Sequence, residues 1–82
     1  MNKYDYKGAS AIWNEFYTLV CEPWEFDENE RQQTRRYFMR TLTRKKGFSQ
    51  FLDVIKERTE EEYLDKKDAD ILTDKILSFV IA

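Results

Sequence analysis

The sequence predicts an all-α protein, a single small compact bundle of four or five helices. Apolar residues recur at spacings of three and four along most of the chain, as they do in helices that bury one face. No stretch alternates β-branched residues over five or more positions between turn residues, so strands are not expected. The segments between the helical patterns are short, which is typical of bundles.

The longest predicted helix spans about residues 28–46. Asp27 with Glu30 three places later forms a capping box at its start, and Gly47 suits the left-handed conformation that ends a helix. No proline or glycine interrupts the segment, whose length at 1.5 Å per residue is about 30 Å. The side expected to face the core carries Thr34, Tyr37, Phe38, Thr41 and Leu42.

The first part of the chain predicts an irregular arm and one helix. Residues 1–7 are polar with two tyrosines, and they are expected to form the arm of a domain spanning residues 1–82. A helix is expected over residues 8–21, with Ser10 as its N-cap. Pro23 is expected to end it by moving Glu22 out of the helical region.

The second half predicts two further helices and an ambiguous segment between them. Ser49 is the expected N-cap of a helix that runs to about Arg58. Thr59 with Glu62 resembles a second capping box, which either opens a short helix or lies in a kinked continuation. Asp68 is the expected N-cap of the last helix, and the apolar end of the chain, residues 77–82, is expected to be buried in the core or against another chain.

Charge is unevenly distributed, although 14 basic and 16 acidic residues give a net charge of only −2. Residues 31–52 contain seven basic residues and no acidic one, whereas residues 53–74 contain nine acidic and four basic residues. In a helix, Arg36, Arg40 and Arg44 share one outer side. This surface either binds phosphates or an acidic partner, or is a solvated face neutralised by acidic neighbours.

Several kinds of chemistry are disfavoured by the residues present. The chain has no histidine, so the usual general base and metal ligand are missing, and its lone Cys21 precedes an acid that would raise its thiol pKa. The acids from Asp65 to Asp74 lack the spacing and the central glycine of an EF-hand. We therefore expect no enzyme activity, no metal and no cofactor.

Helix-turn-helix recognition of DNA is also disfavoured. If the turn is centred on Gly47, positions that this motif keeps apolar hold Lys46, Asp53 and Lys56. The single cysteine, the absence of a signal-peptide pattern and the lack of a long apolar run predict a cytoplasmic protein without a membrane partner.

These observations predict a small interaction protein, meaning an inhibitor, adaptor or regulator that binds a larger protein or protein–nucleic acid complex. The candidate partner-binding residues are Arg31, Arg35, Arg36, Arg40, Arg44 and Trp24. Two alternatives stay open: non-specific nucleic-acid binding by the same arginines, and a structural subunit that forms homo-oligomers through Trp13, Trp24, Phe26 or the apolar C-terminus.

Overall fold

The computed structural model describes residues 6–81, except for the side chain of Trp24. It confirms the predicted fold class: residues 6–81 form an all-α bundle with four α-helices and no strand. The elements are α1 (Tyr6–Phe16), the π-helical η1 (Tyr17–Cys21), the 3-10 helix η2 (Glu22–Trp24), α2 (Glu28–Arg44), α3 (Ser49–Glu60) and α4 (Lys66–Ile81).

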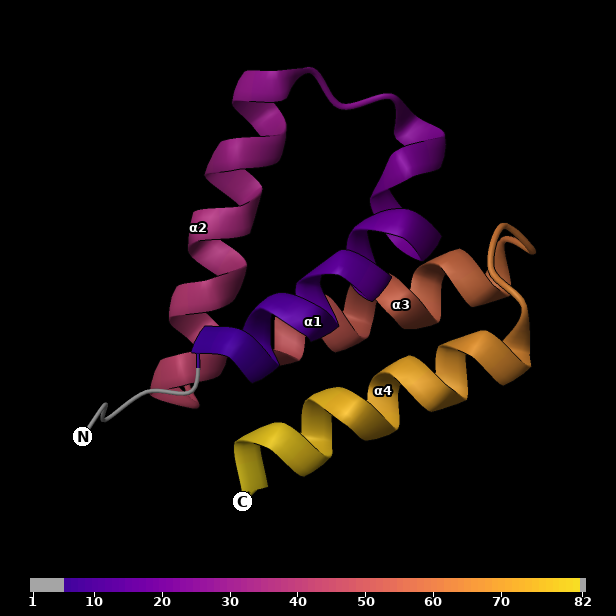
Figure 1. Ribbon diagram of the computed structural model, residues 1–82. Helices are drawn as coiled ribbons and strands as arrows, with labels where there is room; N and C mark the ends of the chain where they lie inside the picture. Colours follow the sequence, from indigo (N-terminus) through magenta and orange to yellow (C-terminus); the bar gives the residue numbers. More distant parts are fainter. Residues whose placement is uncertain (1–5, 82) are drawn as a thin grey trace.

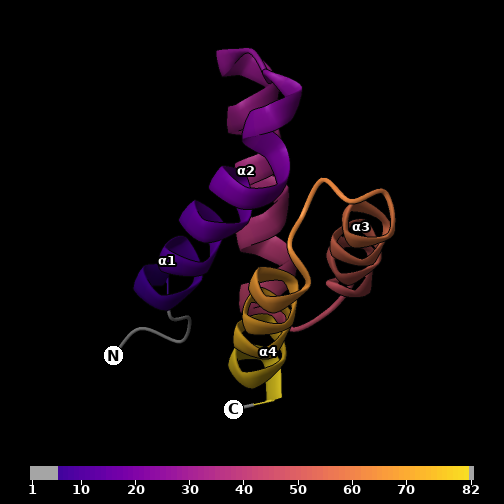
Figure 2. The same cartoon turned by 90° about the vertical axis from the view of Figure 1, so that its right-hand side faces the viewer.

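The helices enclose one core (Figures 1 and 2). α1 packs against both α2 and α4, and α3 packs against α4. Figure 2 shows α4 between α1 and α3. Figure 1 shows that the chain crosses from η2 to the N-terminal end of α2 at the top of the view. From there α2 runs down to the beginning of α1 (Figure 1). This return places the C-terminal half of α2 beside the first turn of α1.

Phe38 of α2 lies at the centre of an aromatic cluster in the core. Its ring centroid is 5.4 Å from that of Trp13, 5.0 Å from that of Phe16 and 4.9 Å from that of Phe51. All four residues are buried, and Leu42, Leu72 and Ile76 complete the interior at 0% exposure. The cluster joins α1, α2 and α3, so one side chain links three helices that are distant in sequence.

The predicted faces of α2 are largely confirmed. Phe38, Thr41 and Leu42 are buried, and the Thr41 hydroxyl donates a hydrogen bond to the carbonyl oxygen of Phe38 at 2.9 Å. Tyr37 was expected on the inward side but is 43% exposed. It lies at the edge of the core, where its ring contacts Phe51 and its hydroxyl accepts a hydrogen bond from the amide of Gln50.

α2 ends earlier than predicted, at Arg44 instead of residue 46. Lys45 adopts the left-handed conformation at φ 55°, its N–H donates to the carbonyl of Leu42, and the N–H of Lys46 donates to that of Thr41. These two bonds are those of a Schellman motif, in which Lys45 takes the position that glycine favours. Gly47 also has a positive φ, of 79°, but it lies in the following turn and does not end the helix.

The first α-helix begins before its predicted start and ends at Phe16, and the helical path continues past the predicted end as η1 and η2. Tyr6 and Lys7, expected in the irregular arm, already belong to α1, whereas residues 1–5 of that arm lie outside the described residues. Ser10 is inside the helix and is not its N-cap. Glu22 keeps a helical conformation at φ −55° and ψ −42°, because Pro23 is accommodated in the first turn of η2. The chain leaves the helical region only at Glu25, at φ 51°.

The segment between α3 and α4 is a turn, and the capping box predicted from Thr59 and Glu62 is wrong. Thr59 belongs to α3, where its hydroxyl donates to the carbonyl of Ile55 at 2.8 Å. Glu62 is left-handed at φ 64°, so the chain reverses there. α4 then begins at Lys66 with Asp65 at its start, not Asp68, because the Asp65 carboxylate accepts a hydrogen bond from the N–H of Lys67 at 3.1 Å.

The C-terminal helix buries less of its apolar end than predicted. Leu72, Ile76 and Val80 face the core, but Ile81 is 79% exposed and Ile71 is 46% exposed. Phe79 is only partly buried against the core. Residue 82 lies outside the described residues.

Candidate functional site

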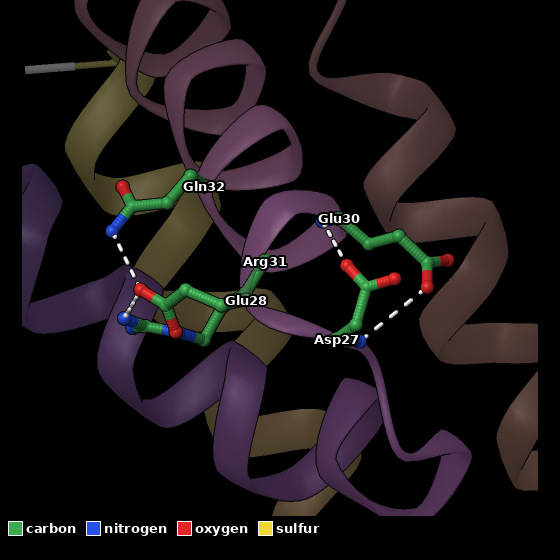
Figure 3. Close-up of polar contacts among 5 residues, drawn as sticks. All are labelled: Asp27, Glu28, Glu30, Arg31 and Gln32. Atoms are coloured by element: carbon green, nitrogen blue, oxygen red, sulfur yellow. Dashed lines mark hydrogen bonds and ion pairs between the residues drawn. The ribbon is translucent and has the colours of Figure 1, made fainter.

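The first turn of α2 is organised by two sets of polar contacts (Figure 3). The Asp27 carboxylate accepts a hydrogen bond from the N–H of Glu30 at 2.8 Å, and the Glu30 carboxylate accepts one from the N–H of Asp27 at 3.4 Å. This is the capping box that the sequence predicts. It sets where α2 starts, and therefore which direction each later arginine faces.

Arg31 is engaged within this first turn. Its guanidinium donates to both oxygens of Glu28, at 3.1 Å and 2.8 Å, and lies 5.9 Å from the centroid of the Tyr17 ring. Figure 3 shows Gln32 also reaching Glu28. The hydrogen bonds from Arg31 and then from Gln32 lower the pKa of Glu28, and the same carboxylate raises the pKa of Arg31. Arg31 thus ties α2 to η1.

The four remaining candidate arginines, Arg35, Arg36, Arg40 and Arg44, line one open groove of about 440 Å³. We call this the arginine groove. Its other lining residues are Met39 and Thr43 of α2 and Tyr6 from the beginning of α1. Met39 is only 8% exposed and so lies at the base, whereas Tyr6 is 53% exposed. The groove therefore combines cationic groups with a small apolar area.

Helical geometry explains why these residues meet. Residues four apart lie nearly above one another, so Arg36, Arg40 and Arg44 form one row and Arg35, Met39 and Thr43 form the adjacent row. At the α-helical rise, successive arginines of the first row are about 6 Å apart along the helix axis. The groove extends about 14 Å along this axis from Arg35 to Arg44. The packing of α1 on the C-terminal half of α2 adds Tyr6.

The charge of the groove is not neutralised by contacts within the described chain. Among residues 6–81, no carboxylate forms an ion pair with Arg35, Arg36, Arg40 or Arg44. Arg36, Arg40 and Arg44 are exposed, and Arg35 is half-buried. The acids of the α3–α4 turn lie at the opposite side of the molecule from α2 in Figure 1. Within residues 6–81, these four guanidinium groups therefore have no ion-pair partner.

The structure separates the six candidate residues into three environments. Four of the arginines share the groove, Arg31 pairs with Glu28 outside it, and Trp24 lies in η2 with its side chain outside the described residues. Sequence reasoning missed Tyr6, Met39 and Thr43. Met39 and Thr43 follow from their four-residue spacing to Arg35, but Tyr6 reaches the groove only through tertiary packing.

Two further hollows lie away from the arginine groove. One, of about 170 Å³, is lined mainly by apolar side chains and contains Cys21 and Arg58. Burial raises the pKa of the Cys21 thiol to about 11, against a smaller opposing effect of the Arg58 charge, so this thiol is not an activated nucleophile. The other, of about 340 Å³, lies between α3 and α4 above Ile55 and Ala69 and has both acids and lysines at its rim.

Residues 6–81 contain no group of three or more acidic or cysteine side chains placed to hold a metal ion. None of the helices formed by these residues combines the length and apolar character needed to cross a bilayer.

Comparisons of the chain with protein-family models, with curated proteins and with solved structures give no match.

Proposed function

We propose that this chain is a small protein-interaction module, an inhibitor, adaptor or regulator that binds a larger protein through the arginine groove. The observation that carries this proposal is the arrangement of Arg35, Arg36, Arg40 and Arg44 around one open groove without acidic partners among residues 6–81. Guanidinium groups form strong, directional hydrogen bonds with carboxylates, and an unneutralised cluster attracts an anionic surface over several ångströms.

The length and surroundings of the groove favour a protein over a long polyanion. Its basic residues span only about 14 Å along α2 at the helical rise. Towards the N-terminus of α2 the surface becomes acidic, with exposed Asp27, Glu28 and Glu30. Nucleic-acid affinity grows with the number of phosphates neutralised, so a short basic surface bounded by acids suits a local acidic patch better.

The test is capture of a partner by the wild-type chain and by charge-reversal variants. The Arg36→Glu, Arg40→Glu double variant should lose the protein captured from a lysate of the cells that produce this chain, because the row would then repel carboxylates. Lys66→Glu, Lys67→Glu is the matched control, since it reverses two charges at the start of α4, outside the groove. The captured protein is then purified, and its binding is measured directly by calorimetry.

Recovery of the same protein by wild type and by the Arg36→Glu, Arg40→Glu variant would place the interface elsewhere. Circular dichroism provides the folding control, because both arginines are exposed and their substitution should leave helicity unchanged.

Non-specific nucleic-acid binding is the second candidate, because guanidinium groups bind phosphates as well as carboxylates. The exposed Tyr6 beside the arginines favours it, since aromatic rings next to a basic groove stack with bases. Titration with duplex DNA and with RNA at low and moderate salt separates the two candidates. Binding that falls steeply with salt supports nucleic acid, and no binding at low salt eliminates it.

A further inference from the structure

The arginine groove has a repeated charge pattern and an apolar base, and together these restrict what can fill it. The row of Arg36, Arg40 and Arg44 offers cations at intervals of about 6 Å along a straight helix. Met39 and Tyr6 of α1 line the groove together with this row. A ligand that uses all of the groove therefore needs both anions at a regular spacing and one apolar side chain.

We infer that the occupant is a short acidic segment of a partner protein, in which two carboxylates flank one apolar side chain. This inference rests on the proposed function and names the chemistry of the partner segment. In an extended segment, side chains on one face recur every 6.6 Å or so, which nearly matches the spacing of the arginines. On that face, two carboxylates pair with Arg36 and Arg44 at the ends of the row, while an apolar side chain at the alternate position between them contacts Met39 and Tyr6.

The apolar contact distinguishes this occupant from a simple polyanion. Met39 keeps 8% of its surface exposed at the base of the groove, and the ring of Tyr6 is half-exposed beside it. Methionine adapts to differently shaped apolar partners because its side chain is unbranched and flexible. Phosphate and the phosphodiester backbone gain no binding free energy from the apolar surface of Met39 and Tyr6. A leucine or phenylalanine between two glutamates gains binding free energy by covering it.

The arginine groove does not extend towards the N-terminus of α2, so it does not suit a long ligand. Glu28 and Glu30 precede Arg35 by two turns or less on the same helix and are exposed. The guanidinium of Arg31, which continues the row of Arg35, is already paired with Glu28, so an anion that continued in this direction would find no unpaired guanidinium. The ligand segment is therefore short, with its acidic residues confined to the length between Arg35 and Arg44.

The direct probe is a fluorescein-labelled peptide with two glutamates four positions apart and leucine midway between them, so that all three side chains share one face of an extended segment. We expect saturable binding to the full chain by fluorescence anisotropy at 150 mM salt. Replacing the glutamates by glutamine should weaken binding at least tenfold, and replacing leucine by serine should weaken it at least threefold. Amide chemical-shift changes should map to residues 35–44 and to the first turn of α1.

The protein variants test the site itself. Arg36→Glu, Arg40→Glu should weaken peptide binding at least tenfold, and Met39→Ala at least threefold, whereas Lys66→Glu, Lys67→Glu should leave it within twofold. Because Met39 is nearly buried, Thr43→Gln serves as a second variant that fills the groove from a half-buried position without removing core volume or changing the charge. It too should weaken binding.

Three outcomes would overturn the inference. The first is tighter binding of a twelve-residue oligothymidylate than of the peptide at 150 mM salt, which would assign the groove to phosphates. The second is peptide binding that is insensitive to the Arg36→Glu, Arg40→Glu change. The third is no peptide binding while that double variant still loses the captured protein, in which case the proposed function stands and only this description of the partner segment fails.

Discussion

At the scale of single residues, helix ends in this chain are formed by residues that are unusual in the left-handed conformation. Glu25, Lys45 and Glu62 have positive φ angles at the ends of η2, α2 and α3. A side chain in this conformation crowds the following carbonyl oxygen, at a cost of about 1–2 kcal/mol. The hydrogen bonds of the following residues to the last helical turn offset this cost.

Lys45→Gly should therefore stabilise the protein. Glycine removes the steric cost at φ 55°, so we expect the free energy of unfolding to rise by about 0.5–1 kcal/mol. Urea denaturation followed by circular dichroism measures the change. Lys46→Gly is the control, because Lys46 does not have a positive φ and should lose stability through the entropy of the unfolded chain. An unchanged or lower stability of Lys45→Gly would contradict the argument.

Cys21 makes stability depend on pH in alkaline solution. Burial raises the pKa of its thiol from 9.0 to about 11, so between these values the unfolded chain releases a proton that the folded protein retains. The unfolded state then binds fewer protons, and stability falls as pH rises through this range. Below pH 9 both states hold the proton and the effect is absent.

The prediction is measured as the difference between wild type and Cys21→Ala in urea midpoints at pH 8, 9.5 and 10.5. The decline with pH should be steeper in the wild type, since the two proteins differ only in the thiol of residue 21. Parallel declines would show that the thiol does not contribute. At pH 8 the native thiol should also react with Ellman's reagent only after urea is added, because Cys21 is 6% exposed.

At the scale of elements, the positions of helices followed from apolar spacing, while their ends followed from local hydrogen bonds that the spacing does not specify. The start of α2 was predictable, because Asp27 and Glu30 form a two-sided capping box. The start of α4 was not, because Asp65 and Asp68 are both good N-cap residues. The structure places the start of the helix at Asp65, three residues after the left-handed Glu62.

Substitution of these two aspartates distinguishes the actual cap from the alternative. Asp65→Ala should cost about 1 kcal/mol, because it removes the acceptor for the N–H of Lys67. Asp68→Ala should change the free energy of unfolding by only a few tenths of a kcal/mol. The lost interaction with the helix dipole is offset by the higher helix propensity of alanine. Equal losses in urea denaturation, or a larger loss for Asp68→Ala, would place the cap at residue 68.

At the scale of the whole molecule, the ring of Phe38 packs against rings from two other helices. The arginines of α2 lie apart from the acidic residues of the turn between α3 and α4 (Figure 1). The rings around Phe38 come from α1 and α3, so the interior is continuous across the bundle. The arginine groove lies mainly on α2. The turn between α3 and α4, which carries Glu61 and Glu62, lies on the other side of the molecule from α2 (Figure 1). Trp13, a candidate for self-association, is 1% exposed and is part of the core, so it is not accessible to a second copy.

Phe38→Ala should therefore destabilise the whole bundle and not α2 alone. Removing a fully buried ring costs about 3–5 kcal/mol, which is a large part of the stability of a small domain. We expect one cooperative urea transition, shifted strongly downward, with tryptophan fluorescence and circular dichroism changing together. Phe38→Leu, with an intermediate shift, keeps the comparison measurable if the alanine variant does not fold.

Arg36→Ala provides the surface control and should stay within about 0.5 kcal/mol of wild type. Separate transitions for the two probes, or a loss below about 1 kcal/mol in Phe38→Ala, would mean that the aromatic cluster does not unite the helices.

The sequence by itself determined the fold class, the inward face of α2 and the row of Arg36, Arg40 and Arg44, because each depends only on the period of the α-helix and on its local caps. Tertiary structure decided that Tyr37 lies at the edge of the core, that Ile81 is exposed and that Tyr6 stands beside Met39 in the arginine groove. These features depend on which helix covers which face. Spacing along one helix shows that a face is apolar or basic, but it does not show how far the neighbouring helix extends over it.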